Sequence, residues 1–349
     1  MNRDFLLKRM GSIHQVCGTK RYQLTDGKSA GVEAVDLYNR AGVGLTVLPG
    51  RGMDLHRMTY KGINLSYLSK TGIASPAYYE SDEFNWLRNF YAGMLTTCGL
   101  RNAGVPCEEN GRVAPPSHQG LHGRIANTGA ENVCVSEEWQ GEDYLLTVSG
   151  RLKESMLHEE NYRLDRTVTM RLDQRGVDIT DRIYNDTFYE WPLMVLYHFN
   201  VGYPLLDEGA LFFMDDSAVE PNTGFAEERL DNHIHIEPPQ HAMEEQLFFH
   251  TPKNGEGGLC RCGVINEKLN LALIIRYDAE VLPYFAQWKM MGEQEYVLGL
   301  EPGNCRPIGL HSQRKLKLEM LPPGGMKDVR LSLEIIDTPQ EIAALKKTI

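Results

Sequence analysis

A period of two dominates the hydrophobic pattern of this chain. Apolar and polar residues alternate through much of 162–172, and segment 177–183 partly repeats the pattern after Gln174-Arg175-Gly176. Alternation of this kind puts every second side chain on one face of a strand, so the two segments predict a hairpin with one buried face. Comparable runs predict further strands at 43–48, 144–150, 192–201, 270–277, 281–288 and 295–301.

A second alternating pair lies near the C-terminus. Residues 314–321 alternate, Pro322-Pro-Gly-Gly325 turns the chain, and residues 329–336 alternate again. This arrangement predicts a second hairpin. Helical signals are few. Residues 338–347 begin with a Thr cap and a first-turn Pro and end with Lys residues, which predicts a terminal helix, and 80–92 could hold a short one.

These elements predict an all-β protein. Regular alternation of strands and helices is missing, which argues against a doubly wound fold, and the period-two faces suit stacked antiparallel sheets. We therefore expect residues 1–349 to form a single large antiparallel β-sandwich domain, with 1–40 as an N-terminal extension carrying edge strands. Residues 101–121 are polar and rich in Gly and Pro, and we expect a long functional loop there.

Composition narrows the possible partners. The net charge is 36 − 47 = −11 with the basic residues scattered, which disfavours nucleic-acid binding. No apolar run approaches the roughly 18 residues of a membrane helix, and no signal peptide is evident. Seven Cys without a framework of spacings indicate a reducing compartment. We expect a cytoplasmic protein that binds neither nucleic acid nor membrane.

One carboxylate stands in an unusual place. Glu301 ends the apolar, strand-like run 296–300, and Pro302-Gly303 follows it. Glu is seldom buried unless it is paired, because taking the charged group out of water is costly. Such a placement is typical of functional sites.

Two histidines lie on strand-like segments upstream of that carboxylate. His122, in Gly120-Leu-His-Gly123, follows the long loop, where small neighbours would leave an imidazole accessible. His198 ends the apolar run 191–197 and shares one face with Met194, Leu196 and Asn200. Taken singly, each histidine fits a structural role at least as well as a catalytic one.

Other polar residues are candidates for ligand binding. Arg51, between Gly50 and Gly52, follows the strand 43–48, where glycines either let the backbone approach a ligand or simply make a turn. Gln287 and Lys289 flank Trp288, a combination that suits sugar binding by stacking and hydrogen bonds. The same segment also fits a strand whose aromatic residues are buried.

A cluster of histidines suggests a rival, metal-based chemistry. His233 and His235 would share one face of a strand, a spacing that can ligate a transition metal, with His241 or Glu237 completing the set. The polar, Pro-rich surroundings favour an exposed loop instead. We therefore predict no metal ligands and no cofactor.

In order, the segments 121–124 (Leu-His-Gly-Arg), 197–200 (Tyr-His-Phe-Asn) and 299–303 (Gly-Leu-Glu-Pro-Gly) resemble motifs of the galactose mutarotase-like (aldose 1-epimerase) superfamily. Segments 48–54, 86–100 and 287–289 look like its DUF4432 branch. The resemblance spans roughly residues 40–320 and implies a β-supersandwich with its site in a groove on one sheet.

The resemblance also implies roles. Glu301 would be the base that takes the proton of the anomeric hydroxyl, His198 the acid that protonates the ring oxygen, and His122 a supporting histidine. The Arg of the mutarotase groove would correspond to Arg101, with Arg88 and Arg51 as competitors, and its substrate-binding Asp has no clear counterpart. The remaining residues that we predict to bind substrate are Asp54, Asn200, Gln287 and Lys289.

The chemistry is consistent with these residues. Ring opening moves one proton off one oxygen and another onto a second oxygen, which needs no cofactor, and each positioned acid or base contributes about 10²–10⁴-fold. This mechanism expects Glu301 ionised and His198 protonated. We predict an aldose 1-epimerase-like enzyme that acts on a small-molecule carbohydrate, an uncommon sugar or sugar acid. A homodimer is the assembly that we consider for it. A noncatalytic sugar-binding sandwich, or a metal-dependent isomerase or lyase using His233, His235 and His241, remains the alternative.

Overall fold

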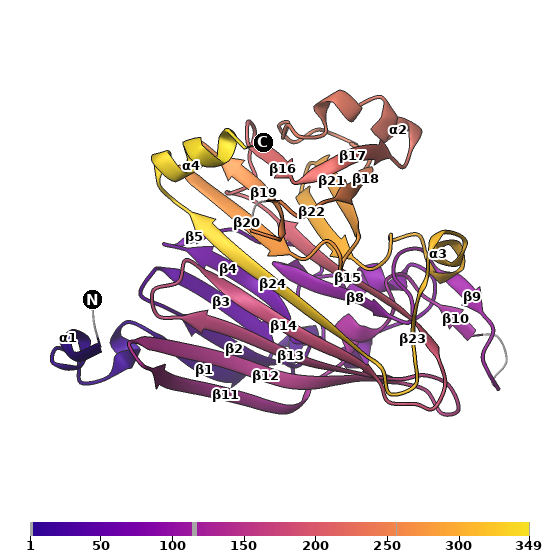
Figure 1. Cartoon of the computed structure of the whole chain (residues 1–349), viewed down its shortest axis with the longest axis horizontal. Coiled ribbons are helices and arrows are strands. Elements are labelled where there is room, and N and C mark those ends of the chain that lie inside the picture. Colours follow the sequence, from indigo (N-terminus) through magenta and orange to yellow (C-terminus); the bar gives the residue numbers. More distant parts are fainter. Residues whose placement is uncertain (1–2, 114–116, 256, 349) are drawn as a thin grey trace.

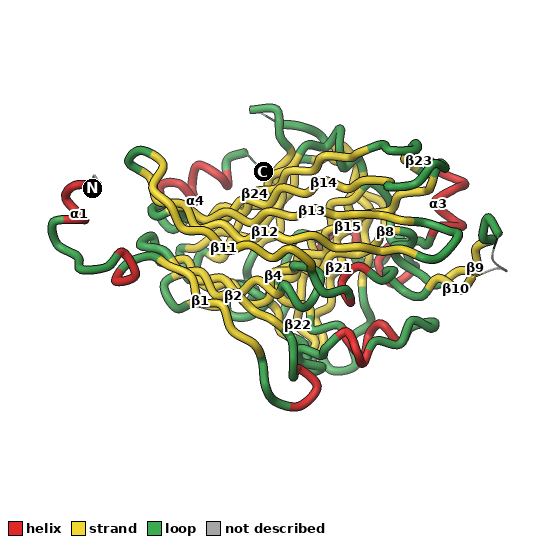
Figure 2. The backbone as a smooth tube through the Cα atoms, turned by 90° about the horizontal axis from the view of Figure 1, so that it is seen from below, coloured by secondary structure: helices red, strands yellow, loops and turns green. Residues whose placement is uncertain are grey.

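Two large β-sheets stacked face to face make up most of the molecule (Figures 1 and 2). The computed structural model describes residues 3–113, 117–255 and 257–348. In Figure 2 the strands β11, β12, β13, β14 and β24 form one layer, and β1, β2, β4 and β22 lie in the other. This antiparallel sandwich confirms the predicted fold class.

The larger sheet has twelve strands. Ten follow one another as β1 (Gly18–Gln23), β2 (Glu33–Tyr38), β3 (Val43–Leu48), β4 (Asp54–Tyr60), β8 (Leu95–Leu100), β15 (Trp191–Val201), β22 (Glu295–Gly303), β21 (Tyr284–Gly292), β18 (Gln246–Pro252) and β17 (Asp216–Pro221). Two short strands join it from the side, β5 (Ile63–Asn64) beside β4 and β23 (Glu319–Leu321) beside β15. Of the strands within residues 1–40, β1 forms one edge of this sheet and β2 lies between β1 and β3.

The second sheet has eight strands. Their order is β11 (Glu131–Gln140), β12 (Asp143–Ser155), β13 (Asn161–Arg171), β14 (Gly176–Asn185), β24 (Met326–Ile336), β20 (Leu271–Tyr277), β19 (Cys260–Asn266) and β16 (Leu211–Met214). Two small two-stranded sheets consist of β6 (Tyr67–Leu68) with β7 (Ala92–Gly93), and β9 (Cys107–Glu109) with β10 (Ser117–Gln119). The last pair lies in the predicted long loop.

Helices are short and lie at the ends and in connections. The α-helices are α1 (Arg3–Leu7), α2 (Gly224–Glu227), α3 (Leu310–Leu316) and α4 (Pro339–Lys346), and the 3-10 helices are η1 (Ile13–Gln15), η2 (Gly27–Ser29), η3 (Pro76–Tyr78), η4 (Asn85–Asn89), η5 (Ile125–Asn127) and η6 (Leu230–Asn232). The predicted terminal helix is α4. Its cap is Thr338, whose side chain accepts a hydrogen bond from the Glu341 N–H. The short helix expected within 80–92 is η4.

The two predicted hairpins had different outcomes. The first is confirmed, because β13 and β14 pair through eight residues on either side of the turn. The second is wrong. Residues 310–316 are helical, β23 pairs with β15, and β24 pairs with β14 and β20. The alternation at 314–321 is only partly that of a strand, and the Pro-Pro-Gly-Gly turn joins strands of different sheets.

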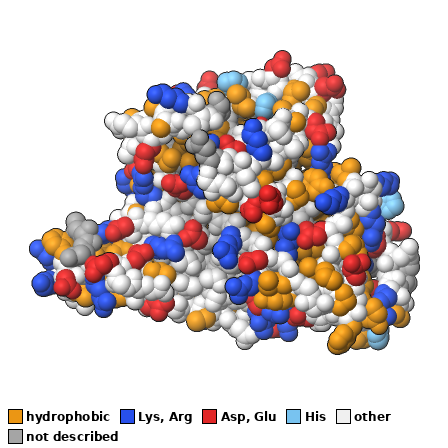
Figure 3. Space-filling model, in the orientation of Figure 1, with side chains coloured by type: hydrophobic (Ala, Val, Ile, Leu, Met, Phe, Trp, Pro, Cys, Tyr) orange, Lys and Arg blue, Asp and Glu red, His pale blue; other side chains and the backbone are white. Residues whose placement is uncertain are grey.

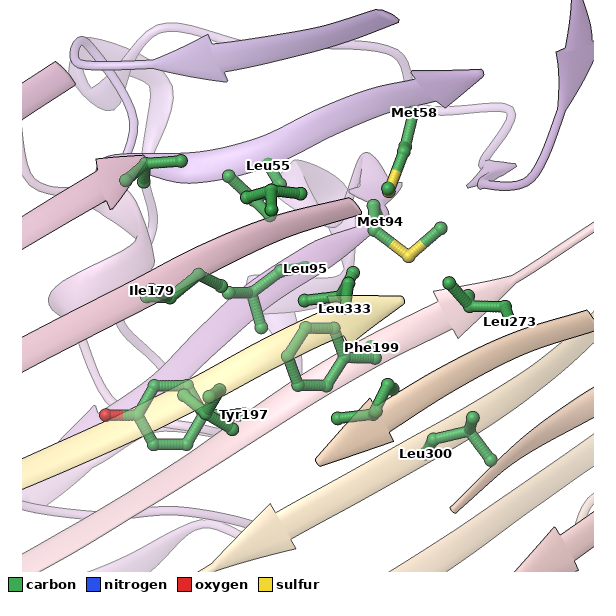
Figure 4. Close-up of a cluster of buried hydrophobic side chains, with 14 of the residues drawn as sticks. Leu55, Met58, Met94, Leu95, Ile179, Tyr197, Phe199, Leu273, Leu300 and Leu333 are labelled. Atoms are coloured by element: carbon green, nitrogen blue, oxygen red, sulfur yellow. The ribbon is translucent and has the colours of Figure 1, made fainter. Parts of the chain in front are cut away.

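The main core fills the space between the two sheets. Figure 4 shows Leu55, Leu95, Tyr197, Phe199 and Leu300 from the larger sheet facing Ile179, Leu273 and Leu333 from the smaller one. On β13 the burial alternates strictly, which reproduces the period-two pattern of the sequence. Residues between core positions on β15 and β22 therefore point to the opposite face of the larger sheet.

A buried ion-pair network connects the two sheets inside this core. Arg166 donates to Asp54 at 2.9 Å and to Asp181 at 2.6 Å, and all three side chains are fully buried. Asp54 also accepts from the backbone and the hydroxyl of Thr97. Even so, burial raises the pKa of Asp54 to about 6. The network fixes β4 and β8 against β13 and β14.

The surface agrees with the mixed charge distribution of the sequence. Figure 3 shows basic and acidic side chains interspersed over the visible face, without a single basic stripe. Among the described residues, no helix is long and apolar enough to cross a membrane. None of the seven cysteines forms a disulfide, and five of them are buried.

Candidate active site

The register of two neighbouring strands brings Glu301 and His198 together. Strands β15 and β22 are antiparallel, with Phe199 opposite Leu300 and Leu196 opposite Gly303. The same register places His198 opposite Glu301, one step further along each strand. Because Phe199 and Leu300 point into the core between the sheets, the imidazole and the carboxylate point to the other face.

A second, smaller hydrophobic cluster covers that other face. It contains Met194 and Leu196 of β15 and Cys98 of β8, together with Trp86, Phe90 and Leu121 from the segments that cross over the sheet. The site residues therefore lie between a sheet and an apolar layer, which explains why every residue of β15 is buried.

The two groups form a buried pair. Nε2 of His198 lies 3.2 Å from Oε1 of Glu301, and the side chains are only 6% and 3% exposed. Nδ1 of His198 has no hydrogen-bond partner among the described residues. Asn200 donates to the backbone carbonyl of His198 at 2.8 Å, which holds the strand locally. The pair can share a proton along the Nε2–Oε1 contact.

Burial favours the uncharged forms of both partners. Desolvation, with a smaller contribution from the charge of Glu245, raises the pKa of Glu301 well above its usual value. Desolvation lowers the pKa of His198 to about 4. The expectation of an ionised Glu301 beside a protonated His198 in the resting site is therefore corrected. The direction of both shifts favours a neutral imidazole beside a carboxylic acid.

The third predicted residue, His122, enters from a loop. Its backbone has a positive φ of 55° and is followed by Gly123 at 71°, a turn that few side chains adopt. Its backbone N–H donates to the Gly104 carbonyl, and its Nδ1 accepts from the Gly104 N–H at 3.3 Å. An acceptor Nδ1 puts the proton of the neutral ring on Nε2.

This histidine is placed to serve as a hydrogen-bond donor. Burial and the neighbouring His198 lower the pKa of His122 to about 3, which keeps the ring neutral. The ring centroids of His122 and His198 lie 5.8 Å apart, edge to face, and Trp86 packs 4.7 Å from His122. The structure thus brings together His122, His198 and Glu301, the three residues predicted to be catalytic.

All three residues line a cavity of about 400 Å³. Most of its wall is apolar, with the aromatic rings of Phe84, Trp86, Phe90 and Trp288 among the contributors. The Phe90 ring lies 5.3 Å and the Trp288 ring 5.5 Å from the His198 ring. A cavity of this size and character is typical of a small-molecule site.

A glycine makes room for the pair. Gly299 lies two residues before Glu301 on the same face of β22. A Cβ at this position would lie 2.8 Å from Oε1 of Glu301, 3.0 Å from Cβ of Trp288 and 3.2 Å from Cε1 of His198. Only a residue without a side chain leaves these three groups in place.

The predicted arginines lie outside the cavity lining. Arg51 is buried and donates to three backbone carbonyls, so the turn interpretation of its glycines holds. Arg101 pairs with Glu160 at 2.7 Å, and its guanidinium lies over the Trp191 ring. Arg88 donates to Oδ1 of Asn85. Arg51 and Arg101 are therefore held by protein groups, whereas Arg88 is exposed.

The other predicted substrate ligands are also engaged elsewhere. Asp54 belongs to the buried network with Arg166, and Asn200 is fully buried behind His198. Gln287 connects His250 with the His233 carbonyl, and Lys289 donates to the carbonyls of Asn232 and His235 and pairs with Glu237. These side chains hold the segment 232–237 against β21.

The histidines proposed as metal ligands do not converge. Nδ1 of His233 contacts the Leu230 carbonyl, and His241 pairs with Glu293. The described part of the chain contains no group of three or more His, Cys, Asp or Glu side chains arranged to hold a metal ion. His233, His235 and His241 therefore do not form the ligand set that the metal-dependent alternative requires.

Sequence reasoning missed most of the cavity wall. Trp86 and Phe90 belong to η4 and its C-terminal end, and Asn222 and Glu245 come from loops flanking β17 and β18. The aromatic spacing in 84–90 was the one available signal. Glu245 accepts from Nε1 of Trp288 at 2.8 Å, a contact between residues 43 positions apart that no local pattern could indicate.

Comparison with known proteins identifies one family. The profile of the family described as "Domain of unknown function (DUF4432)" matches residues 29–335. None of the curated proteins compared with the chain matches it.

Solved structures share the fold. A Klebsiella pneumoniae protein provisionally called an aldose 1-epimerase superposes with a TM-score of 0.89 at 24% identity, covering 100% of this chain and 90% of that one. A galactose mutarotase-like protein from Clostridium acetobutylicum gives 0.65 at 14% identity, covering 93% and 100%. Galactose 1-epimerase from Lactobacillus acidophilus gives 0.57 at 13% identity, covering 91% and 98%.

Proposed function

We propose that this chain, which belongs to the DUF4432 family, is an aldose 1-epimerase that interconverts the anomers of a sugar by opening and closing its ring. The observation that carries the proposal is the buried pair of Glu301 and His198 at 3.2 Å, beside His122, in one small cavity. The fold shared with proteins named as aldose and galactose 1-epimerases supports the same reaction class.

The reaction needs two proton transfers. Glu301 accepts the proton of the anomeric hydroxyl, and His198 delivers a proton to the ring oxygen. The bond between the anomeric carbon and the ring oxygen breaks, and the anomeric carbon becomes an aldehyde carbonyl. Rotation of the aldehyde and the reverse transfers close the ring in the other configuration. Each positioned group contributes about 10²–10⁴-fold.

The protonation of the pair follows from this scheme. One shared proton must lie on His198 when the sugar reacts, whereas burial favours its position on Glu301. Transfer of this proton from Glu301 to His198 across the 3.2 Å contact produces the ionised carboxylate and the protonated imidazole that the reaction requires. The Nε2–H of His122 donates to a sugar oxygen nearby and stabilises negative charge that develops there.

The test is anomer exchange. We expect the protein to accelerate the exchange of anomeric protons in saturation-transfer NMR for at least one sugar in a broad panel. Glu301→Gln and His198→Asn should each lower kcat at least about 100-fold, because each removes one proton-transfer partner. His241→Asn, which alters an exposed histidine outside the cavity, is the matched control. Unchanged exchange in both site variants would refute the mechanism.

A noncatalytic carbohydrate-binding protein is the second candidate, because aromatic rings make up much of the cavity wall. Such a protein would bind a sugar in calorimetry and leave the rate of anomer exchange at its uncatalysed value. The same NMR panel separates the two functions.

A further inference from the structure

The charges around the cavity differ from those expected for an enzyme that handles acidic sugars. Among the residues that line it, all within the described part of the chain, there is no Lys or Arg. The ionisable residues in the lining are Glu301, Glu245, His122 and His198, and burial favours the neutral form of both histidines. Arg51, Arg101 and Lys289 are held by protein groups, as described above, and Arg88 is exposed outside the lining.

Glu245 is the residue that gives the cavity its negative charge. Its side chain is exposed and lines the cavity mouth beside Trp288, whose indole N–H donates to it at 2.8 Å. Its charge acts on the interior, since it contributes to the raised pKa of Glu301. A carboxylate or phosphate on the ligand would meet the same repulsion.

The wall offers little compensation for an anion. Apart from the catalytic residues and Glu245, the polar groups among the described lining side chains are Asn222 and the indole N–H groups of Trp86 and Trp288, the last of which donates to Glu245. An anion moved from water into an apolar site loses hydration that only cations or several donors could replace. An uncharged sugar loses much less, and its C–H faces gain contact with the aromatic rings.

We propose that the cavity selects uncharged sugars and excludes carboxylated and phosphorylated ones, with Glu245 as the residue that sets this specificity. The inference rests on the proposed function for its assignment of the cavity as a sugar site. It narrows the substrate class, because the sugar acids left open by the sequence are removed. The selected sugar turns an apolar edge to Trp86, Phe90 and Trp288.

The test compares sugars that differ at one carbon. D-fucose, D-galactose and D-galacturonate carry a methyl, a hydroxymethyl and a carboxylate group on the same ring, and D-quinovose, D-glucose and D-glucuronate repeat the series. Binding is measured by calorimetry and saturation-transfer NMR at low ionic strength, where charge repulsion is least screened. We expect at least a tenfold preference for the neutral members of the series that binds.

Two variants locate the cause. Glu245→Gln removes the charge and keeps an oxygen that can accept from the Trp288 N–H. This variant should reduce the preference for the neutral sugar over its uronate at least about threefold. Glu244→Gln makes the same change in the neighbouring exposed residue, which does not line the cavity, and should leave the preference unchanged. An unaltered preference in Glu245→Gln would overturn the role of Glu245.

The outcomes separate this inference from the proposed function. Uronates that bind as tightly as neutral sugars, or a cavity that binds none of the six, would overturn the inference. Selective binding of neutral sugars without accelerated anomer exchange would refute the proposed function and support the inferred selectivity. Accelerated exchange with a preference for uronates would do the reverse.

Discussion

Replacing Gly299 with Ala tests whether the close packing of the catalytic pair matters. The added methyl group would lie 2.8 Å from Oε1 of Glu301 and 3.2 Å from Cε1 of His198. Carbon and oxygen atoms in ordinary contact are about 3.4 Å or more apart, so the carboxylate must move by roughly half an ångström or more. The Nε2–Oε1 distance is already 3.2 Å, so such a shift would separate the two groups beyond the distance needed for direct proton transfer.

The expected consequences differ for activity and stability. A displacement of about 1 Å in a catalytic group can lower the rate about 100-fold, and we expect a loss of kcat near that size for Gly299→Ala. Overpacking a buried site typically costs about 1–3 kcal/mol, so the free energy of unfolding should fall by a similar amount. Exchange NMR on the best substrate of the panel measures kcat, and urea denaturation measures the stability.

The control is Gly292→Ala at the end of β21. A Cβ there has its nearest contact at 3.3 Å, the flexible end of Met290. This variant should retain both stability and exchange rate within about twofold. If Gly299→Ala also exchanges anomers at the wild-type rate, the argument that this glycine holds Glu301 and His198 at contact distance is refuted.

Four further predictions concern buried ionisable groups. Glu301→Gln should raise the free energy of unfolding at pH 8 and change it little near pH 4. The reason is that a carboxyl group whose pKa is raised by folding loses its favourable contribution to stability as the pH rises. Urea denaturation at the two pH values measures this difference, and an equal effect at both would contradict the prediction. Burial lowers the pKa of His198 to about 4, so its contribution to stability is present above about pH 6.5 and lost as the pH falls towards 4. His198→Asn should flatten the acid side of the stability profile in urea denaturation, and an unchanged profile would contradict this. Arg166→Met should lower the free energy of unfolding by about 3–5 kcal/mol, because it leaves Asp54 and Asp181 unpaired in the core. Asp54→Asn should keep the anomer-exchange rate of the folded protein within about threefold of the wild-type rate. A complete loss of exchange would restore Asp54 as a substrate ligand.

The sequence predicted the sheets better than their pairing. Strict alternation identified β13 and β14 because one face is buried and the other is partly exposed, and that contrast is written in every second residue. The same rule failed for β23 and β24. The partner of β23 on β15 and one partner of β24, β14, lie more than a hundred residues away, and the other partner, β20, lies 54 to 64 residues away; the partner of a strand is set by three-dimensional packing.

For the site, the sequence indicated the residues at its centre and missed its surroundings. Glu301 and His198 interrupt apolar runs, which makes them conspicuous, and an ordered resemblance linked them to His122. Arg51, Arg101 and Lys289 gave equally polar signals, yet each satisfies backbone carbonyls or a neighbouring carboxylate. A one-dimensional pattern does not distinguish a buried donor that serves the fold from one that serves a ligand.

The division of the site between strands and connections has a consequence for how this protein could change. Glu301 and His198 lie on adjacent central strands whose intervening residues fill the core, so their positions are tied to folding itself. The aromatic wall and Glu245 come from η4 and from loops, which a chain can lengthen or replace without rebuilding a sheet. Under the proposed function, the residues for proton transfer and those for sugar choice can therefore diverge independently, and transplanting these connections between homologues is a practical test of this division.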